Sequence, residues 1–131
     1  MGVGYDRFDR PALAARGITV CNCPDYGTSE VADHALALAL SLRRGVLLHS
    51  DRQRREQPKP YMFVDSPLVR RLQRSTFGIL GLGRIGTAVA LRAKAFGFQV
   101  LFYDPYSANG VDKSLDIVGA VCLRLCLASY Q

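Results

Sequence analysis

The feature that most constrains this chain is the segment Gly81–Gly86, which reads Gly-Leu-Gly-Arg-Ile-Gly. Directly before it, the apolar run Phe77–Leu80 suits a strand that is buried on both faces. After it, Arg84–Phe96 contains no proline and several alanines, and Gly97 supplies a C-terminal stop for a helix. The pattern therefore predicts a strand, a glycine turn and a helix in direct succession.

A second apolar run, Val100–Tyr103, ends on Asp104, with seventeen residues between Gly86 and this acid. The order of strand, glycine turn, helix, strand and acid is the arrangement that binds a dinucleotide. In it, Gly81 permits the tight turn, Gly83 lets the backbone approach a pyrophosphate, and Gly86 lets the helix lie close to the strand. The alternative is a glycine-rich turn in a parallel sheet that binds nothing.

The chemistry of each group predicts the cofactor. Unpaired N–H groups and the positive end of the helix dipole would receive the phosphates. Asp104 would accept hydrogen bonds from the ribose hydroxyls and repel a 2′-phosphate, and Pro105 and Tyr106 follow it where an NADP-binding protein often carries a basic residue. We therefore predict NAD rather than NADP. The candidate cofactor-binding residues are Val31, Gly81, Gly83, Arg84, Ile85, Gly86 and Asp104.

Length and charge narrow the class of protein. A chain of 131 residues with 49% apolar residues is one ordinary domain and is not disordered throughout. Arginines concentrated between Arg43 and Arg74 contribute much of the net charge of +6. They are either a nucleic-acid patch or a solvated face, and we favour the solvated face because no nucleic-acid-binding motif accompanies them.

The four cysteines, Cys21, Cys23, Cys122 and Cys126, lack the paired C-x-x-C spacing of a zinc ribbon. We expect reduced, partly buried thiols and no metal site. An apolar run such as Ala35–Leu40 is far too short to span a bilayer, and no signal peptide is visible. These features predict a soluble intracellular protein in the cytoplasm, with the nucleus as the alternative.

Before the glycine motif, the pattern predicts a short helix over Phe8–Ala15 and a strand over Ile18–Cys23. A long helix over Val31–Leu48 follows, capped by Thr28 or Ser29 and continued by a solvated extension to Glu56. This helix is apolar nearly all round, which is typical of a helix buried on several sides or against a partner chain. His34 and His49 are interpreted as ordinary helix-surface residues, because no nucleophile is marked beside either.

The remaining segments carry weaker signals. Gln57–Pro60 indicates a linker, and Ser66 caps a predicted short helix over Leu68–Leu72. Another helix is predicted from Val111 to Leu115. The tail from Val118 onward suits neither a capped amphipathic helix nor a clean strand.

With these residues in place, the chain from Gly2 to about Leu115 resembles the D-isomer-specific 2-hydroxyacid dehydrogenase family. The segment Arg92–Tyr106 is especially similar to the C-terminal-binding-protein corepressor branch of that family. The resemblance implies an α/β fold, namely a partial Rossmann-type NAD-binding fold with one βαβ unit, preceded by a long crossing helix. Residues 1–27 would be a remnant of the substrate domain, and residues 28–131 a truncated NAD-binding domain whose tail departs from the family from about residue 116.

The resemblance also implies roles for the N-terminal residues. Gly2–Asp6 is similar to the family's substrate-domain loop, so the backbone amides of Val3 and Gly4 would bind the substrate carboxylate. Asn22-Cys23-Pro24 is similar to the Asn-x-Pro that ends a strand of the substrate domain. The helix of residues 29–50 would pack against a partner subunit, which implies a homodimer.

The family's later segments, which carry a catalytic Arg, a Glu that orients the base and a His that shuttles the proton, are absent from the sequence. We therefore assign no catalytic residue and expect the chain, as given, to be inactive. Three hypotheses follow. The chain is an NAD-binding fragment of a 2-hydroxy acid/2-oxo acid oxidoreductase, an NAD(H)-sensing corepressor-like module, or a fragment that does not fold stably. The expected partners are NAD(H), a small acid only if missing segments complete the site, and nucleic acid only indirectly; we expect no membrane.

Overall fold

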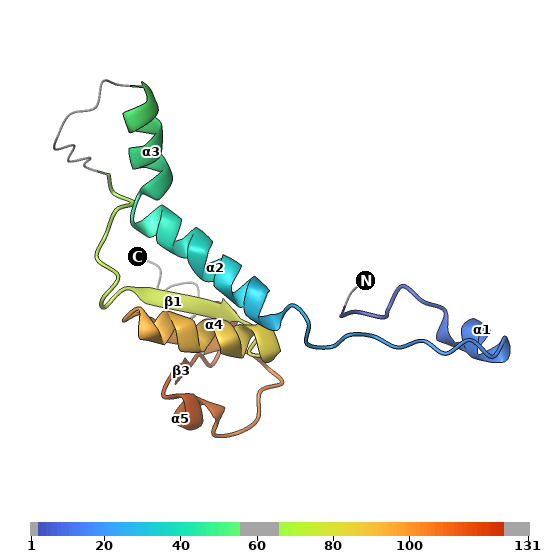
Figure 1. The fold of residues 1–131 in the computed structure, drawn as a ribbon. Helices are drawn as coiled ribbons and strands as arrows, with labels where there is room; N and C mark the ends of the chain where they lie inside the picture. Colours follow the sequence, from blue (N-terminus) through green and yellow to red (C-terminus); the bar gives the residue numbers. More distant parts are fainter. Residues whose placement is uncertain (1–2, 56–65, 125–131) are drawn as a thin grey trace.

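Three parallel strands form the centre of the computed structural model, which describes residues 3–55 and 66–124 (Figure 1). They are β1 (Thr76–Leu80), β2 (Gln99–Tyr103) and β3 (Val118–Gly119), in the spatial order β1-β2-β3. The parallel pairing of β1 with β2 confirms the two strands predicted on either side of the glycine motif. The mixed α/β fold is also as predicted.

The third strand lies in the tail, for which the sequence predicted no regular structure. Val118 pairs with Leu101 of β2, and the N–H of Ala120 donates to the carbonyl of Phe102 over 2.7 Å. The prediction is therefore wrong at the start of the tail. A two-residue strand carries no periodicity of its own, and it exists here because β2 presents an unpaired edge to it.

The helix predicted after the glycine motif is confirmed as α4, Arg84–Ala95, and it ends before Gly97, which has a φ of +83°. Two glycines have visible physical roles. Gly81 has a φ of +89°, which a side chain would strain, and a Cβ added at Gly86 would overlap the carbonyl oxygen of Gly81. The glycine turn and the close approach of α4 to β1 therefore depend on these two residues.

The hydrophobic core lies where α4 packs against β1 and β2 and where α2 (Thr28–Arg43) packs along α4. Alanines allow the two helices to approach closely, since Ala32, Ala90 and Ala93 are fully buried. An ion pair between Arg92 and Asp33 joins the helices at their surface. The buried core residues are Ala32, Leu36, Ile79, Val89, Ala90, Ala93, Phe98, Val100, Phe102 and Ile117.

The long helix predicted over Val31–Leu48 is in fact two helices. α2 ends at Arg43 and α3 runs over Val46–Arg55, because Gly45 adopts a φ of +63° between them. The N-cap of α2 is Gly27 and not Thr28 or Ser29, since the hydroxyl of Thr28 donates to the carboxylate of Asp25 instead. His34 is exposed on α2 and His49 is half-buried on α3.

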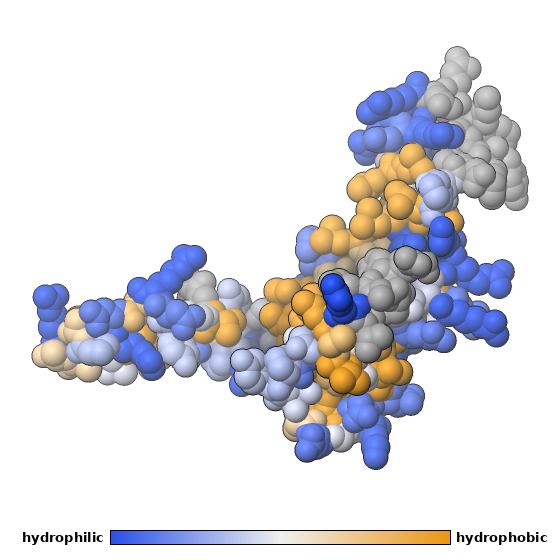
Figure 2. Space-filling view, turned by 180° about the vertical axis from the view of Figure 1, so that it is seen from behind, coloured by the Kyte–Doolittle hydropathy of each residue, from blue (hydrophilic) through white to orange (hydrophobic). Residues whose placement is uncertain are grey.

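Much of the apolar surface of α2 and the start of α3 is uncovered, and it forms the apolar region that runs along these helices in Figure 2. Leu38, Leu42, Val46 and Leu47 are 51–68% exposed. The fold thus leaves apolar area available for further burial.

Residues 3–27, here called the N-terminal arm, extend away from the sheet (Figure 1). The arm contains α1, Arg10–Ala15, which begins two residues later than predicted because the Asp9 side chain caps it. The strand predicted over Ile18–Cys23 is wrong. This segment has no strand partner among the described residues. Its links within the arm are hydrogen bonds from the Ile18 N–H to the Leu13 carbonyl and from the Asn22 amide to the Val3 carbonyl.

The segment that leads into β1 forms turns, so the helix predicted over Leu68–Leu72 is also wrong. The N–H of Arg70 donates to the carbonyl of Arg43 on α2, which diverts it from a helical partner. In contrast, α5 covers Val111–Leu115 as predicted. The predicted linker Gln57–Pro60 lies outside the described residues.

The cysteine side chains differ from the expectation of partial burial. Cys21, Cys23 and Cys122 are free thiols and exposed, because the arm and the tail pack against little else; Cys126 lies outside the described residues. Within residues 3–55 and 66–124, no helix is long and apolar enough to cross a membrane.

The contact between Gly86 and Gly81 predicts a difference between two glycine substitutions. Gly86→Ala should lower the free energy of unfolding by roughly 1–3 kcal/mol, because its Cβ forces α4 away from β1. Gly83→Ala is the matched control, since an added Cβ there meets no atom within 4 Å and the backbone has an ordinary φ of −72°. Urea unfolding of both variants tests this, and equal losses would contradict it.

Candidate cofactor-binding site

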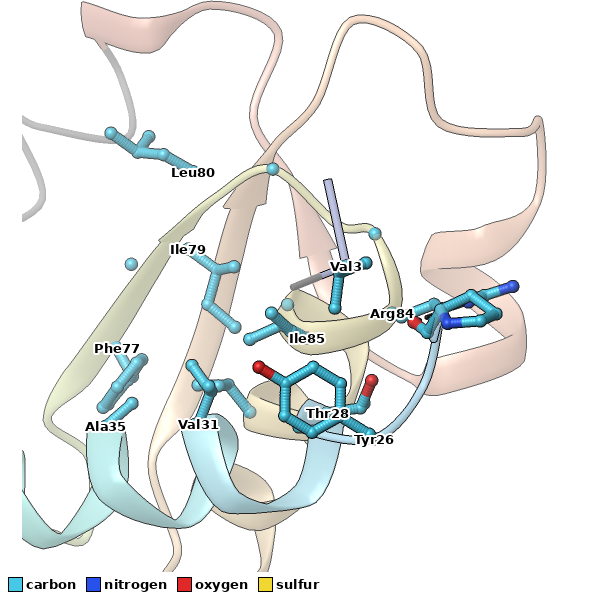
Figure 3. Close-up of a pocket in the computed structure, with 17 residues that line it drawn as sticks. Val3, Tyr26, Thr28, Val31, Ala35, Phe77, Ile79, Leu80, Arg84 and Ile85 are labelled. Carbon is cyan, nitrogen blue, oxygen red and sulfur yellow. Dashed lines mark hydrogen bonds between the residues drawn. The ribbon is translucent and has the colours of Figure 1, made fainter. Parts of the chain in front are cut away.

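A cavity of about 700 Å³ lies between the start of α2, the glycine turn and β1. Figure 3 shows Thr28 and Val31 on the α2 side, Phe77 and Ile79 on the β1 side, and Ile85 between them. Seven of the predicted binding residues line the cavity: Val3, Val31, Gly81, Gly83, Arg84, Ile85 and Gly86. Gly4 and Asp104 are not among the lining residues.

Sequence reasoning did not select several residues that line the cavity, among them Tyr26, Thr28, Ala35 and Phe77. Thr28 and Tyr26 belong to Pro24–Thr28, here called the wall segment, which closes one side of the cavity. The predicted turn after Asn22-Cys23-Pro24 marked this segment in the sequence, but nothing in the pattern placed it beside the glycine motif. Ala35 and Phe77 look like ordinary core residues in the sequence.

The amino end of α4 opens onto this cavity. Gly83 is the N-cap residue, and the N–H of Thr87 is the donor that bonds back to its carbonyl over 2.9 Å. The N–H groups of the first turn have no partner within the helix and point outward from its positive end. No acidic residue occupies this turn. The arrangement is suited to an anion such as a pyrophosphate.

Asp104 stands at the carboxyl end of β2 and holds the glycine turn. Its Oδ2 accepts a 2.6 Å hydrogen bond from the N–H of Leu82, and its Oδ1 accepts a 2.9 Å bond from the N–H of Tyr106. These two donors, Leu82 first, hold the pKa of Asp104 below its usual value, so the group is a carboxylate at neutral pH. Each carboxylate oxygen retains accepting capacity for a ribose hydroxyl.

Arg84 occupies the first position of α4, and its side chain turns toward the wall segment. The guanidinium Nη1 donates to the carbonyl of Pro24 over 2.9 Å, joining residues sixty positions apart. Val3 reaches the cavity from the N-terminal arm, where its carbonyl accepts from the Asn22 amide. The start of the arm, the wall segment and the first turn of α4 therefore meet at one end of the sheet.

The position of the cavity agrees with a general rule for parallel sheets. The strand order β3-β2-β1 is one half of a doubly wound sheet, in which the next strand pairs with the outer side of β1. Ligands bind such sheets outside the carboxyl ends of the strands, at the point where the order reverses. The glycine turn and Asp104 lie at the carboxyl ends of β1 and β2.

Comparison with known proteins agrees with this geometry. The sequence profile of the family described as "D-isomer specific 2-hydroxyacid dehydrogenase, NAD binding domain" matches residues 36–123. The chain belongs to this family. NAD is the cofactor of the domain. The match includes β3 and continues past Asp116, where the sequence suggested that the family pattern ends.

Two relatives illustrate the range of the family. The chain is 38% identical over 118 residues to C-terminal-binding protein 1 of Caenorhabditis elegans, covering 88% of this chain and 16% of the relative. It is 39% identical over 120 residues to a glyoxylate reductase of Korarchaeum cryptofilum, covering 88% of this chain and 35% of the relative. The chain thus spans about a sixth and about a third of these relatives.

Solved structures give the same picture. A D-lactate dehydrogenase from Aquifex aeolicus, complexed with NAD and lactic acid, superposes with a TM-score of 0.72 at 33% identity, over 91% of this chain and 34% of that one. An NAD-binding protein of the same family from Polaromonas superposes with a TM-score of 0.77 at 30% identity, over 97% and 39% of the two chains. These structures support the partial Rossmann-type fold.

The hydrogen bonds of Asp104 predict how stability depends on pH. Because the pKa of Asp104 is lower in the folded chain than in the unfolded one, its stabilising effect is complete above about pH 5 and is lost as the pH falls below about 4. The difference in unfolding free energy between the natural chain and Asp104→Asn should therefore be constant at neutral pH and shrink in acid. Urea unfolding over a pH series measures this; a difference that grows in acid would refute it.

Proposed function

We propose that this chain binds NAD(H) at the amino end of α4 as the cofactor-binding part of an oxidoreductase that interconverts 2-hydroxy acids and 2-oxo acids. The observation that carries the proposal is the bond between Asp104 and Leu82, which joins the acid after β2 and the glycine turn after β1 in one unit. Both halves of a dinucleotide site, one for phosphate and one for ribose, are then adjacent.

Each residue has a proposed role. The backbone around Gly83 and the first turn of α4 receives the pyrophosphate, with Arg84 beside it. Asp104 accepts hydrogen bonds from the adenosine ribose. Val31 and Ile85 contact the cofactor as apolar lining of the cavity. In a completed substrate site, the amides of Val3 and Gly4 bind the carboxylate of the acid.

We propose that the chain by itself holds the cofactor without turning over substrate. Hydride transfer requires a base at the reacting hydroxyl, and the family's Arg, Glu and His segments do not occur in the sequence. In this proposal residues 1–27 derive from the substrate domain and residues 28–131 from the cofactor domain. Within the part of the chain that the structure describes, a single hydrogen bond, from Arg84 to the Pro24 carbonyl, joins the N-terminal arm to residues 66–124, which supports this division.

A second candidate is an NAD(H)-sensing, corepressor-like binding module. The similarity to C-terminal-binding protein 1 of Caenorhabditis elegans favours it. In such a module, cofactor binding would promote association, and nucleic acid would be contacted only indirectly. Sequencing the transcript on both sides of this segment separates the two candidates: in-frame Arg, Glu and His segments support the enzyme, and their absence from the locus would refute it.

We also propose that the chain forms a homodimer through the helical region 29–50. Leu38 and Leu42 are 55–60% exposed and lie four residues apart along α2. Such spacing aligns side chains on one face of a helix. A second copy could bury this stripe, and the exposure of these two leucines supports the need for such burial.

The cofactor proposal predicts saturable binding of NADH and much weaker binding of NADPH. Asp104→Ala should weaken NADH binding by about tenfold to a hundredfold, because the ribose hydroxyls lose a charged acceptor. Gly83→Ala should also weaken it, because its Cβ would project into open space beside the phosphates while the fold stays intact. Calorimetric titration checks both variants, and a folded sample that binds no NADH would contradict the proposal.

The dimer proposal predicts concentration-dependent association that the double substitution Leu38→Glu and Leu42→Glu abolishes, since two charges cannot be buried in an apolar interface. Ala37→Glu is the matched control, because Ala37 is exposed on the side of α2 that carries Asp33 and His34. Sedimentation velocity at several concentrations measures the mass. A natural chain that remains monomeric throughout, or a control that dissociates equally, would count against this interface.

A further inference from the structure

The hydrogen bond between Arg84 and Pro24 joins two parts of the fold that are far apart in the sequence. Within the described residues, it is the only hydrogen bond that joins the N-terminal arm, residues 3–27, to residues 66–124. The other bonds of the wall segment are local, such as Thr28 to Asp25 and Val31 to Gly27. The wall segment continues directly into α2, which packs against α4, and beyond that continuity the Arg84 side chain supplies its hydrogen bond to α4.

The wall segment is part of the cofactor cavity and not a remote surface. Pro24, Tyr26 and Thr28 line the cavity opposite the glycine turn, and Arg84 lines it from α4 (Figure 3). If the wall segment moved away, the cavity would lose one side and the cofactor would lose the contacts made there. A bond that holds the wall segment in place therefore also holds that side of the cavity in place.

Arg84 does not stabilise α4 at the position that it occupies. A cation in the first turn of a helix lies at the positive end of the helix dipole, which is unfavourable, and no acidic residue in that turn compensates. The guanidinium has five N–H donors in a rigid fork, and only one is used by the Pro24 carbonyl. The remaining donors are available to an anion at the amino end of α4.

We propose that Arg84 is a positioning residue that pins the wall segment over the cofactor cavity through the Pro24 carbonyl. The inference rests on the proposed NAD(H) site and deepens it. A single guanidinium then bridges the wall segment and the cofactor pyrophosphate, so that binding the cofactor and ordering the wall segment favour each other. By linkage, the two effects are reciprocal.

The first test uses the 131-residue chain without cofactor and measures backbone amide hydrogen exchange. Arg84→Ala should speed exchange of the Val31 amide, which donates to the Gly27 carbonyl of the wall segment, by about fivefold to tenfold, because the wall segment loses its anchor. Arg84→Gln, which retains a neutral donor, should have a smaller effect. Arg71→Ala is the matched control, since Arg71 is an exposed arginine in the segment before β1, is not among the residues that line the cavity, and its loss removes the same charge.

The second test adds NADH. Arg84→Ala should weaken binding about tenfold and abolish the slowing of exchange that NADH causes at the Val31 amide, whereas Arg71→Ala should do neither. Circular dichroism establishes that each variant is folded. Unchanged exchange in Arg84→Ala overturns the proposal. This holds even if NADH binding is weakened, because Arg84 would then act only on the cofactor and not on the wall segment. Absence of NADH binding by the natural chain would instead refute the proposed function, and the cofactor-free exchange separates these failures.

Discussion

The carboxylate of Asp104 is the group on which the candidate site depends. By accepting the N–H of Leu82, it ties the end of β2 to the glycine turn that follows β1. This bond fixes the direction in which the chain enters α4, and so the direction of the unpaired N–H groups at the helix amino end. The same bond lowers the pKa of the carboxyl, which keeps a negative acceptor beside a positive helix end. Ribose and phosphate recognition therefore share one local structure.

Incomplete burial is the second constraint on this chain. α2 uses Ala32 and Leu36 to cover the core, while Leu38 and Leu42 on a neighbouring face meet solvent. At about 25 cal/mol per Å² of apolar surface, burial of such a stripe would be a substantial addition to the stability of a small domain. This chain covers only about a sixth to a third of the length of its two relatives. Segments like the ones that it does not cover, or a second copy of the chain, are therefore the candidates for burying this apolar stripe.

Local chemistry explains which predictions succeeded. α4 and α5 were predicted because helix propensity and stop signals act within a few residues, and β1 and β2 because each is a short apolar run beside a glycine or an acid. The strand over Ile18–Cys23 and the helix over Leu68–Leu72 were wrong because partners far along the sequence decide such segments. The first lacks a neighbouring strand, and the second gives the N–H of Arg70 to α2. β3 was missed for the converse reason, since its partner creates it.

The sequence by itself determined the glycine turn, the helix after it, the acid at the end of the second strand and the family resemblance, because these depend on residue types at short, regular spacings. Only the tertiary structure decided that Asp104 holds Leu82 across twenty-two positions and that Arg84 reaches Pro24 across sixty. A hydrogen bond between distant residues depends on where two backbones lie in space, and the packing of α2 against α4 sets that position. The cavity for the cofactor is a product of this packing.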